Sequence, residues 1–122
     1  MSLRLVLADD EAPTARVMSL ALAKQGFDVE VCYNGEEALN SILQSPPDVL
    51  VTDIEMPVMT GQELCEELQK RLPERTFPIY VITGVTDLVH RKWTREIQDL
   101  FFLEKPVSIR RLTQELEQRL RS

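Results

Sequence analysis

The sequence predicts an α/β domain, in which a doubly wound parallel sheet of five strands is covered by helices on both faces. Five short apolar segments alternate with five segments of helical character along the 122 residues. Repeated strand–helix units favour a parallel sheet, because right-handed crossovers place the helices on its faces. The length fits a single domain spanning residues 1–122.

The first strand–helix unit begins with residues 3–8 (LRLVLA), a continuous apolar run typical of a buried strand. The helix that follows has Pro13 near its start and Gly26 after its end. In residues 27–33 (FDVEVCY), large apolar side chains recur at every second position, so Phe27, Val29, Val31 and Tyr33 share one face. This period of two predicts a half-exposed second strand near an edge of the sheet.

The second helix is predicted from its ends. Asn34 and Glu37 have the spacing of a capping box, and the Ser-Pro-Pro sequence at 45–47 ends the helix. The third strand, residues 48–53 (DVLVTD), is again a nearly continuous apolar run. Such runs belong in the centre of a parallel sheet, where both faces are buried.

A second capping box, Thr60 with Glu63, predicts the start of a third helix that ends near Pro73. Residues 78–83 (PIYVIT) form the fourth strand. Residues 86–99 are predicted to be helical, although their apolar pattern is weak.

Residues 100–106 (LFFLEKP) form the fifth strand, and Ser108 is predicted to cap the last helix. Four residues at helical spacing give this helix an inward apolar face: Ile109, Leu112, Leu116 and Leu120.

The composition argues against several classes of protein, namely those that bind nucleic acid, bind membranes or span them. The net charge of −6 argues against a nucleic-acid surface or an anionic membrane face, both of which require basic residues. No apolar run approaches the roughly 20 residues that a membrane span needs, and the N-terminus lacks the shape of a signal peptide. The two cysteines have no metal-site spacing. These features together predict a cytoplasmic protein with free thiols.

The residues that end the predicted strands are the most informative. Asp9 and Asp10 follow the first strand, Asp53 ends the third, Thr83 ends the fourth and Lys105 closes the fifth. In an open parallel sheet, ligands bind outside the carboxyl ends of the strands. The fold therefore predicts that three carboxylates, a hydroxyl and an ammonium group meet along one edge.

Three carboxylates at one edge need a counter-charge. At about 4 Å and an effective dielectric constant near 20, each pair repels by about 4 kcal/mol. Lys105 supplies one positive charge, and a hard divalent cation with oxygen ligands, Mg²⁺, would complete the neutralisation. Such a site suits phosphoryl transfer, with Asp53 as the nucleophile that forms an acyl phosphate.

Four motifs stand in order at these strand ends: Asp9-Asp10, DIEMPVMTG around Asp53, VITG with Thr83, and EKP with Lys105. Together they resemble the receiver domain of bacterial two-component response regulators, over essentially the whole chain. The resemblance implies the flavodoxin-like strand order 2-1-3-4-5. It also implies a signalling switch rather than an enzyme, although the domain would take part in its own phosphotransfer and dephosphorylation.

At matched positions, the resemblance implies that Asp53 is the phosphoacceptor. Asp9 and Asp10 would hold Mg²⁺ together with Asp53, and the backbone carbonyl of Glu55 would complete the protein ligands. Lys105 would bind a phosphoryl oxygen and the Asp53 carboxylate. The resemblance also implies a cis peptide bond between Lys105 and the following proline.

Thr83 would move toward the phosphoryl group, and Phe102 would be the aromatic switch that turns inward with it. A plain core aromatic is the alternative role for Phe102. Glu55 and Val85 match positions that tune hydrolysis of the acyl phosphate, and they lead us to expect a moderately long-lived phosphorylated state. One departure is the segment before the fifth strand, which lacks the Gly-Ala pair frequent in such domains.

The implied partners are a sensor histidine kinase or phosphotransfer protein, and an effector domain or downstream protein. The polar side of the last helix could pair across a homodimer, and a merely solvated helix is the equal alternative. The charged residues concerned are Arg110, Arg111, Glu115, Glu117 and Arg119.

Three alternative functions compete with this interpretation. A phosphohydrolase of the haloacid dehalogenase type would use Asp53 with Glu55 but would leave Asp9 and Asp10 unexplained. In a flavodoxin-like FMN protein, the acidic ADDEAPT loop would repel the phosphate. A pseudo-receiver would not need all five site residues. Whether the chain is a stand-alone receiver or part of a longer regulator or kinase stays open.

Overall fold

The computed structural model describes residues 2–84 and 92–121. Its strands are β1 (Leu3–Ala8), β2 (Phe27–Cys32), β3 (Val49–Asp53), β4 (Ile79–Thr83) and β5 (Leu100–Glu104). Its helices are α1 (Ala12–Lys24), α2 (Gly35–Gln44), α3 (Gly61–Arg71) and α5 (Ile109–Arg121).

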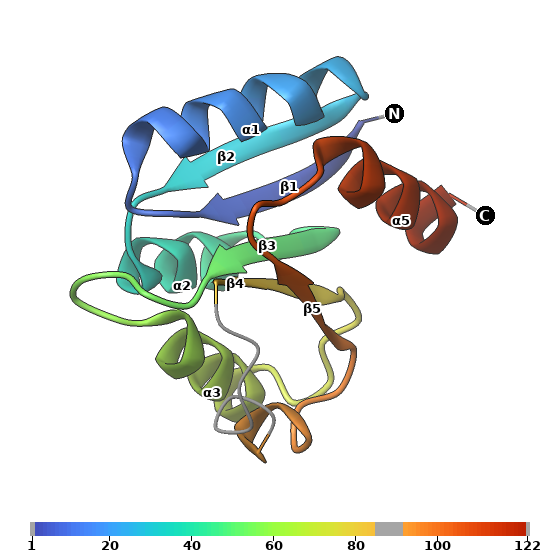
Figure 1. The fold of residues 1–122 in the computed structure, drawn as a ribbon. Helices are drawn as coiled ribbons and strands as arrows, with labels where there is room; N and C mark the ends of the chain where they lie inside the picture. Colours follow the sequence, from blue (N-terminus) through green and yellow to red (C-terminus); the bar gives the residue numbers. More distant parts are fainter. Residues whose placement is uncertain (1, 85–91, 122) are drawn as a thin grey trace.

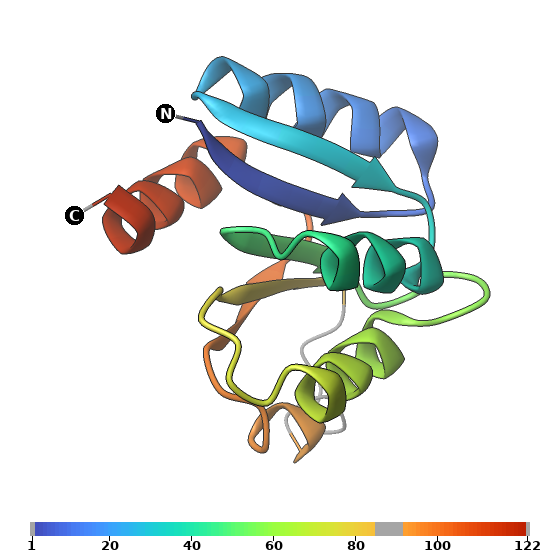
Figure 2. The ribbon, with the colours of Figure 1, turned by 180° about the vertical axis from the view of Figure 1, so that it is seen from behind.

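The strands form one parallel sheet in the order β2-β1-β3-β4-β5, which confirms the predicted fold class and strand order. Helices α1 and α5 cover one face of the sheet, and α2 and α3 cover the other (Figure 1). Figure 2 shows the molecule from behind, with α2 and α3 toward the viewer. The carboxyl ends of β1 and β3 point to the same edge, away from the two chain termini.

The predicted element boundaries agree with the observed ones to within two residues for the strands. The predicted helix at 86–99 falls partly on residues 85–91, which lie outside the described residues. Residues 92–94 are helical, and a turn then leads into β5. Helix α1 ends before Gly26, whose φ of 98° is a left-handed conformation that suits glycine.

The helix caps form largely as predicted. Thr60 and Glu63 make a complete capping box at the start of α3. At α2, the Asn34 side chain accepts a hydrogen bond from the Glu37 backbone N–H. The return bond differs from the prediction, because the Glu37 carboxylate accepts from the Tyr33 N–H and the Asn34 side-chain amide.

Two apolar clusters lie on the two faces of the sheet, and together they hold the helices against the strands. The first cluster packs α2, α3, Trp93 and Ile97 against one face. The second packs α1 and α5 against the other, and all four residues predicted for the inner face of α5 belong to it. Strands β3 and β4 are buried along their whole length, as expected for the sheet centre.

The cysteines are free and buried. Burial, reinforced by the carboxylates of Glu30 and Glu37, raises the pKa of the Cys32 thiol to about 11. Burial raises that of Cys65 to about 12. Both thiols are therefore protonated and unreactive near neutral pH. In the described part of the chain, no helix has the length and apolar character needed to cross a membrane.

Candidate functional site

Asp53 lies at the carboxyl end of the central strand β3, and its side chain is buried. One carboxylate oxygen, Oδ1, accepts a hydrogen bond of 2.7 Å from the Ile54 backbone N–H. The other, Oδ2, lies 3.1 Å from the Lys105 ammonium group. A charge can end an apolar strand because both oxygens of this carboxylate have donors.

Asp9 and Asp10 follow β1, the neighbour of β3 in the sheet. One carboxylate oxygen from each of Asp9, Asp10 and Asp53 lies within 4.8 Å of the others. Asp9 is buried and Asp10 is exposed, so the cluster has one open side. Asp9 Oδ1 accepts from the Glu11 backbone N–H at 2.9 Å, and the Asp9 N–H donates to the carbonyl of Cys32.

The crowding of negative charge is visible in the pKa of Asp9. Burial raises that pKa above its ordinary value, and the charge of Asp53 raises it further, against the opposing hydrogen bond from Glu11. For Lys105, burial alone would lower the pKa. Its hydrogen bond to Asp53 and the charges of Asp53 and Asp9 outweigh burial, so the pKa is raised. Lys105 is therefore held in its charged form beside the carboxylates.

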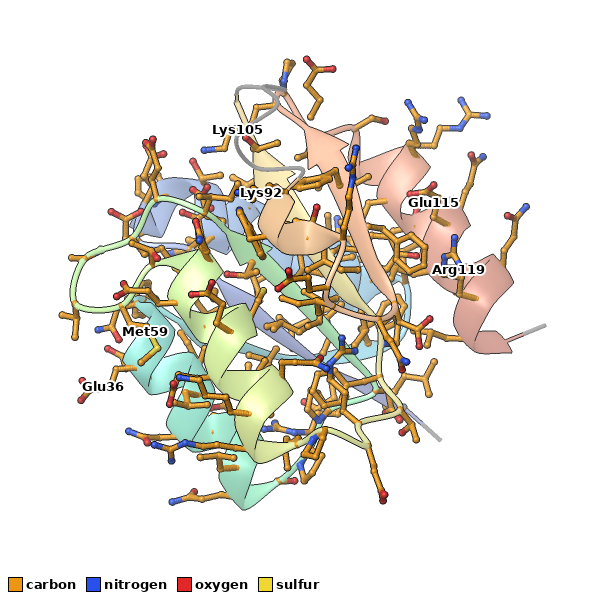
Figure 3. All side chains as sticks on the ribbon, turned by 90° about the horizontal axis from the view of Figure 1, so that it is seen from below. Glu36, Met59, Lys92, Lys105, Glu115 and Arg119 are labelled. Atoms are coloured by element: carbon orange, nitrogen blue, oxygen red, sulfur yellow. The ribbon has the colours of Figure 1, made fainter. Side chains whose placement is uncertain are left out.

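Lys105 follows β5, which is separated from the Asp53 strand β3 by β4, so its side chain crosses the end of β4 to contact Asp53. The Lys105 side chain is 41% exposed and extends from the end of β5 toward the loops after β1 and β3 (Figure 3). Its backbone N–H donates to the carbonyl of Thr83 at 2.8 Å. The Lys105–Pro106 peptide bond is cis, as the resemblance implied.

Thr83 is the last residue of β4, next to Ile82, which pairs with Asp53 across the sheet. Thr83 is buried. Phe102 pairs with Val81 and Glu104 with Thr83, so Phe102 and Thr83 lie on the same face of the sheet, two residues apart in register. Phe102 is half-buried and packs against the first apolar cluster. The geometry places the two residues as diagonal neighbours.

Glu55 is exposed and lines a pocket together with Asp10. The pocket has a volume of about 480 Å³ and opens beside the acidic cluster. Carboxylates together with backbone oxygens are the donors that a hard divalent cation prefers, and a site with one exposed carboxylate leaves room for water ligands. The residues present therefore fit Mg²⁺. Val85, the other position expected to tune hydrolysis, lies outside the described residues.

Sequence reasoning missed how tightly the loop from β3 to α3 is built. A Cβ atom on Gly61 would lie 2.1 Å from the carbonyl oxygen of Asp53. The Gly61 N–H also donates to the carbonyl of Ile54 at 2.7 Å. A glycine eight residues after the aspartate was visible in the sequence, but a contact between backbones leaves no trace in side-chain pattern. The backbone of Gly61 thus packs directly against the backbone of Asp53 and Ile54.

The same loop contains a strained residue. Val58 has a φ of 68°, and the Met59 N–H donates to the carbonyl of Pro57, which closes a three-residue turn around Val58. The Met59 carbonyl then accepts from the Gly35 N–H at the start of α2. Met59 and Glu36 lie close together where the loop meets α2 (Figure 3). The turn therefore ties the loop that contains Glu55 to α2.

Comparison with known proteins gives a consistent result. The family model described as the response regulator receiver domain matches residues 5–117. Among the solved structures that resemble the chain over nearly its whole length, three illustrate the result. The chemotaxis response regulator CheY4 of Vibrio cholerae is 27% identical with a TM-score of 0.86, covering 98% of this chain and 99% of that one.

A CheY-like response regulator receiver domain protein from Methanospirillum hungatei is 25% identical with a TM-score of 0.88, covering 98% and 94% of the two chains. The signal receiver domain of a signal transduction histidine kinase from Syntrophus aciditrophicus is 25% identical with a TM-score of 0.86, covering 98% and 90%. With the family model matching most of its length, the chain belongs to the response regulator receiver domain family.

Proposed function

We propose that this domain, assigned to residues 1–122, is a phosphorylation-dependent switch that accepts a phosphoryl group on Asp53. The donor would be a sensor histidine kinase or a phosphotransfer protein. One observation carries the proposal: a buried carboxylate at the end of the central strand lies within 4.8 Å of two further carboxylates and 3.1 Å from a lysine ammonium group. The family match over residues 5–117 favours this reading over the phosphohydrolase and flavin alternatives.

Asp9, Asp10 and Asp53 would hold Mg²⁺ together with the Glu55 backbone carbonyl. The ion supplies positive charge for the phosphoryl oxygens when it is bound. The mutual proximity of the three carboxylates supports this assignment, because their repulsion makes the site favourable for a cation.

In the transfer step, a carboxylate oxygen of Asp53 forms a bond to phosphorus while the P–N bond of the donor phosphohistidine breaks. The electron pair of that bond returns to the imidazole ring. Lys105, already 3.1 Å from Asp53, can bind one phosphoryl oxygen, and the Thr83 hydroxyl can donate to another. In dephosphorylation, water attacks the same phosphorus, the O–P bond to Asp53 breaks, and the carboxylate and inorganic phosphate are released. The domain would thus contribute to both reactions.

The phosphoryl group adds roughly −1.5 to −2 charge and three strong acceptors. It would favour the arrangement in which Thr83 approaches it and Phe102 turns inward, and the surface around β5 and α5 would change shape. That surface would regulate an effector domain or a downstream protein, or pair across a homodimer. We further propose that the domain works in the cytoplasm and binds neither nucleic acid nor membranes directly.

The test is to incubate the protein with acetyl phosphate and Mg²⁺ and to map the modified residue by mass spectrometry. We expect phosphate on Asp53 and none in the Asp53→Asn variant. Asp28→Asn, at an exposed position of β2, is the matched control and should retain modification. Equal incorporation into the wild type and Asp53→Asn would refute the assignment. The phosphorylated protein should be moderately long-lived, and decay within seconds would contradict that expectation.

A further inference from the structure

Among the described residues, the buried side-chain nitrogen and oxygen atoms that lack hydrogen bonds lie in one part of the structure. The three such side-chain atoms are Nε of Arg75, the hydroxyl of Tyr80 and the indole Nε1 of Trp93. All three belong to β4 or to segments next to β4 and β5. A buried donor without an acceptor loses its hydration without compensation, so each is a local cost of this conformation.

Of the three residues with such atoms, Trp93 is the one that belongs to the apolar cluster against which Phe102 packs. Its side chain is 9% exposed and belongs to the first apolar cluster, together with Ile97. Phe102 packs against the same cluster, on the face of the sheet that also contains Thr83. Because interiors are closely packed, a change in the position of Phe102 can reach the Trp93 ring through this shared cluster.

The two residues after Ile97, Gln98 and Asp99, are held by hydrogen bonds to Arg75 and to the start of β4. Two guanidinium nitrogens of Arg75 donate to the carbonyls of Phe77 and Gln98. The carbonyl of Asp99, a residue with a φ of 53°, accepts from the Ile79 N–H at 2.8 Å. The segment that contains Trp93 is thus anchored where it meets β5. A rearrangement of this segment is expected at its Trp93 end rather than at Gln98.

We infer that the Trp93 indole N–H is a built-in bias of the switch: it has no hydrogen-bond partner in the conformation described here and gains one when the Asp53 site is phosphorylated. The inference rests on the proposed function. The unsatisfied donor makes the present conformation less favourable than its apolar packing alone would make it. It therefore lowers the free energy needed to reach the other conformation.

Trp93 is the only tryptophan of the chain, so its fluorescence reports this change directly. With acetyl phosphate and Mg²⁺, we expect the emission maximum to move to longer wavelength as the N–H acquires a partner. Phosphate mapped to Asp53 with an unchanged Trp93 spectrum would overturn the inference and leave the proposed function intact. An absence of phosphate on Asp53 would instead refute the proposed function, and the inference with it.

A second experiment separates the effect of the Trp93 N–H from that of the ring shape. Replacement of Trp93 by β-(3-benzothienyl)alanine keeps the ring shape and exchanges the N–H for sulfur. We expect the unphosphorylated protein to melt at higher temperature. Its apparent affinity for beryllofluoride with Mg²⁺ should fall roughly fivefold or more, since the relief of an unsatisfied donor no longer favours the other state.

Ile97→Val is the control, because it removes one methylene group from the same cluster without touching a polar atom. It should lower the melting temperature and leave the beryllofluoride affinity within about twofold of wild type. An isostere that fails to raise the melting temperature would overturn the inference.

Discussion

The Lys105 ammonium group lies 3.1 Å from Oδ2 of Asp53, and this contact joins β5 to β3 across the end of the strand between them. The strand in between, β4, ends at Thr83, whose carbonyl accepts from the Lys105 N–H. One residue therefore contacts both the proposed phosphoacceptor and the proposed switch threonine. If Asp53 is phosphorylated as proposed, we expect the Lys105 contact to change, and with it the position of the β4 end.

Replacing Lys105 by Met should impair the site more than the fold. Phosphorylation of Asp53 by acetyl phosphate should slow by at least about tenfold, because a charge that stabilises the phosphoryl oxygens is lost. Stability should fall by about 1 kcal/mol, since Lys105 is partly exposed and solvent screens the pair. Lys70→Met, which breaks an exposed pair with Glu67 on α3, is the control and should change neither quantity measurably. A Lys105 variant phosphorylated at the wild-type rate would contradict the proposed role.

Asp9→Asn should stabilise the protein without Mg²⁺ and abolish the stabilisation that Mg²⁺ gives. The buried Asp9 carboxylate lies beside Asp53, so its charge costs free energy, whereas the asparagine oxygen can still accept from the Glu11 N–H. We expect a gain in the free energy of unfolding, because a buried charge beside another carboxylate is removed. Urea unfolding in EDTA and in Mg²⁺ would measure both effects. If Asp9→Asn were less stable than wild type in EDTA, the charge of Asp9 would not be destabilising as we infer.

The pH dependence follows from the same pKa shift. Burial and Asp53 raise the pKa of Asp9 above 3.8, so the folded protein binds a proton more tightly there than the unfolded chain does. The Asp9 contribution to stability is therefore most favourable at low pH and declines as pH rises from about 4 through the raised pKa. This decline should be absent in Asp9→Asn when the two proteins are compared in EDTA. At the alkaline end, the raised pKa of Lys105 makes its contribution disappear as pH rises above 10.5.

Gly61→Ala and Gly84→Ala form a matched pair on either side of Asp53. The added methyl at Gly61 would lie 2.1 Å from the Asp53 carbonyl oxygen, a backbone atom in the central strand that cannot move away cheaply. We expect a loss of about 2–3 kcal/mol and slower phosphorylation. At Gly84 the nearest atom of the described residues is Lys105 Cδ at 3.8 Å, an ordinary contact, so stability should stay within about 0.5 kcal/mol of wild type. Chemical denaturation of both variants measures these losses in the free energy of unfolding. Equal losses would contradict the steric argument.

The meeting of Asp9, Asp10 and Asp53 could be predicted from the strand pattern, whereas the full strand order was implied by the resemblance to receiver domains. Continuous apolar strands belong in the sheet centre, and parallel strands bring their carboxyl ends to one edge. The observed register places Ala8 beside Thr52, so Asp9, which follows β1, lies next to Asp53, the last residue of β3. The 4.8 Å proximity of the carboxylates is a consequence of that register.

The details that could not be predicted depend on backbone contacts and on three-dimensional packing. The weak pattern over 86–99 did not reveal that Trp93 and Ile97 are buried, because their neighbours along the chain are polar. The close approach of Gly61 to Asp53 and the left-handed conformation of Val58 involve the main chain, which every residue shares. Such features leave almost no signal in a single sequence, and here they surround the proposed phosphoryl site.

Val58→Gly should stabilise the protein by about 1 kcal/mol, although glycine usually weakens a fold. Val58 has a φ of 68°, which a β-branched residue adopts only at a cost of roughly 1–3 kcal/mol. Its side chain is 73% exposed, so little burial is lost on truncation. Glycine adds unfolded-state entropy worth about 0.5–1 kcal/mol, which is smaller than the strain relieved. Val17→Gly is the control: Val17 is 64% exposed on α1 with helical backbone, and its replacement should cost about 0.5 kcal/mol. Opposite signs for the same substitution in urea unfolding would locate the strain at Val58, whereas a loss at both positions would show that the turn is not strained.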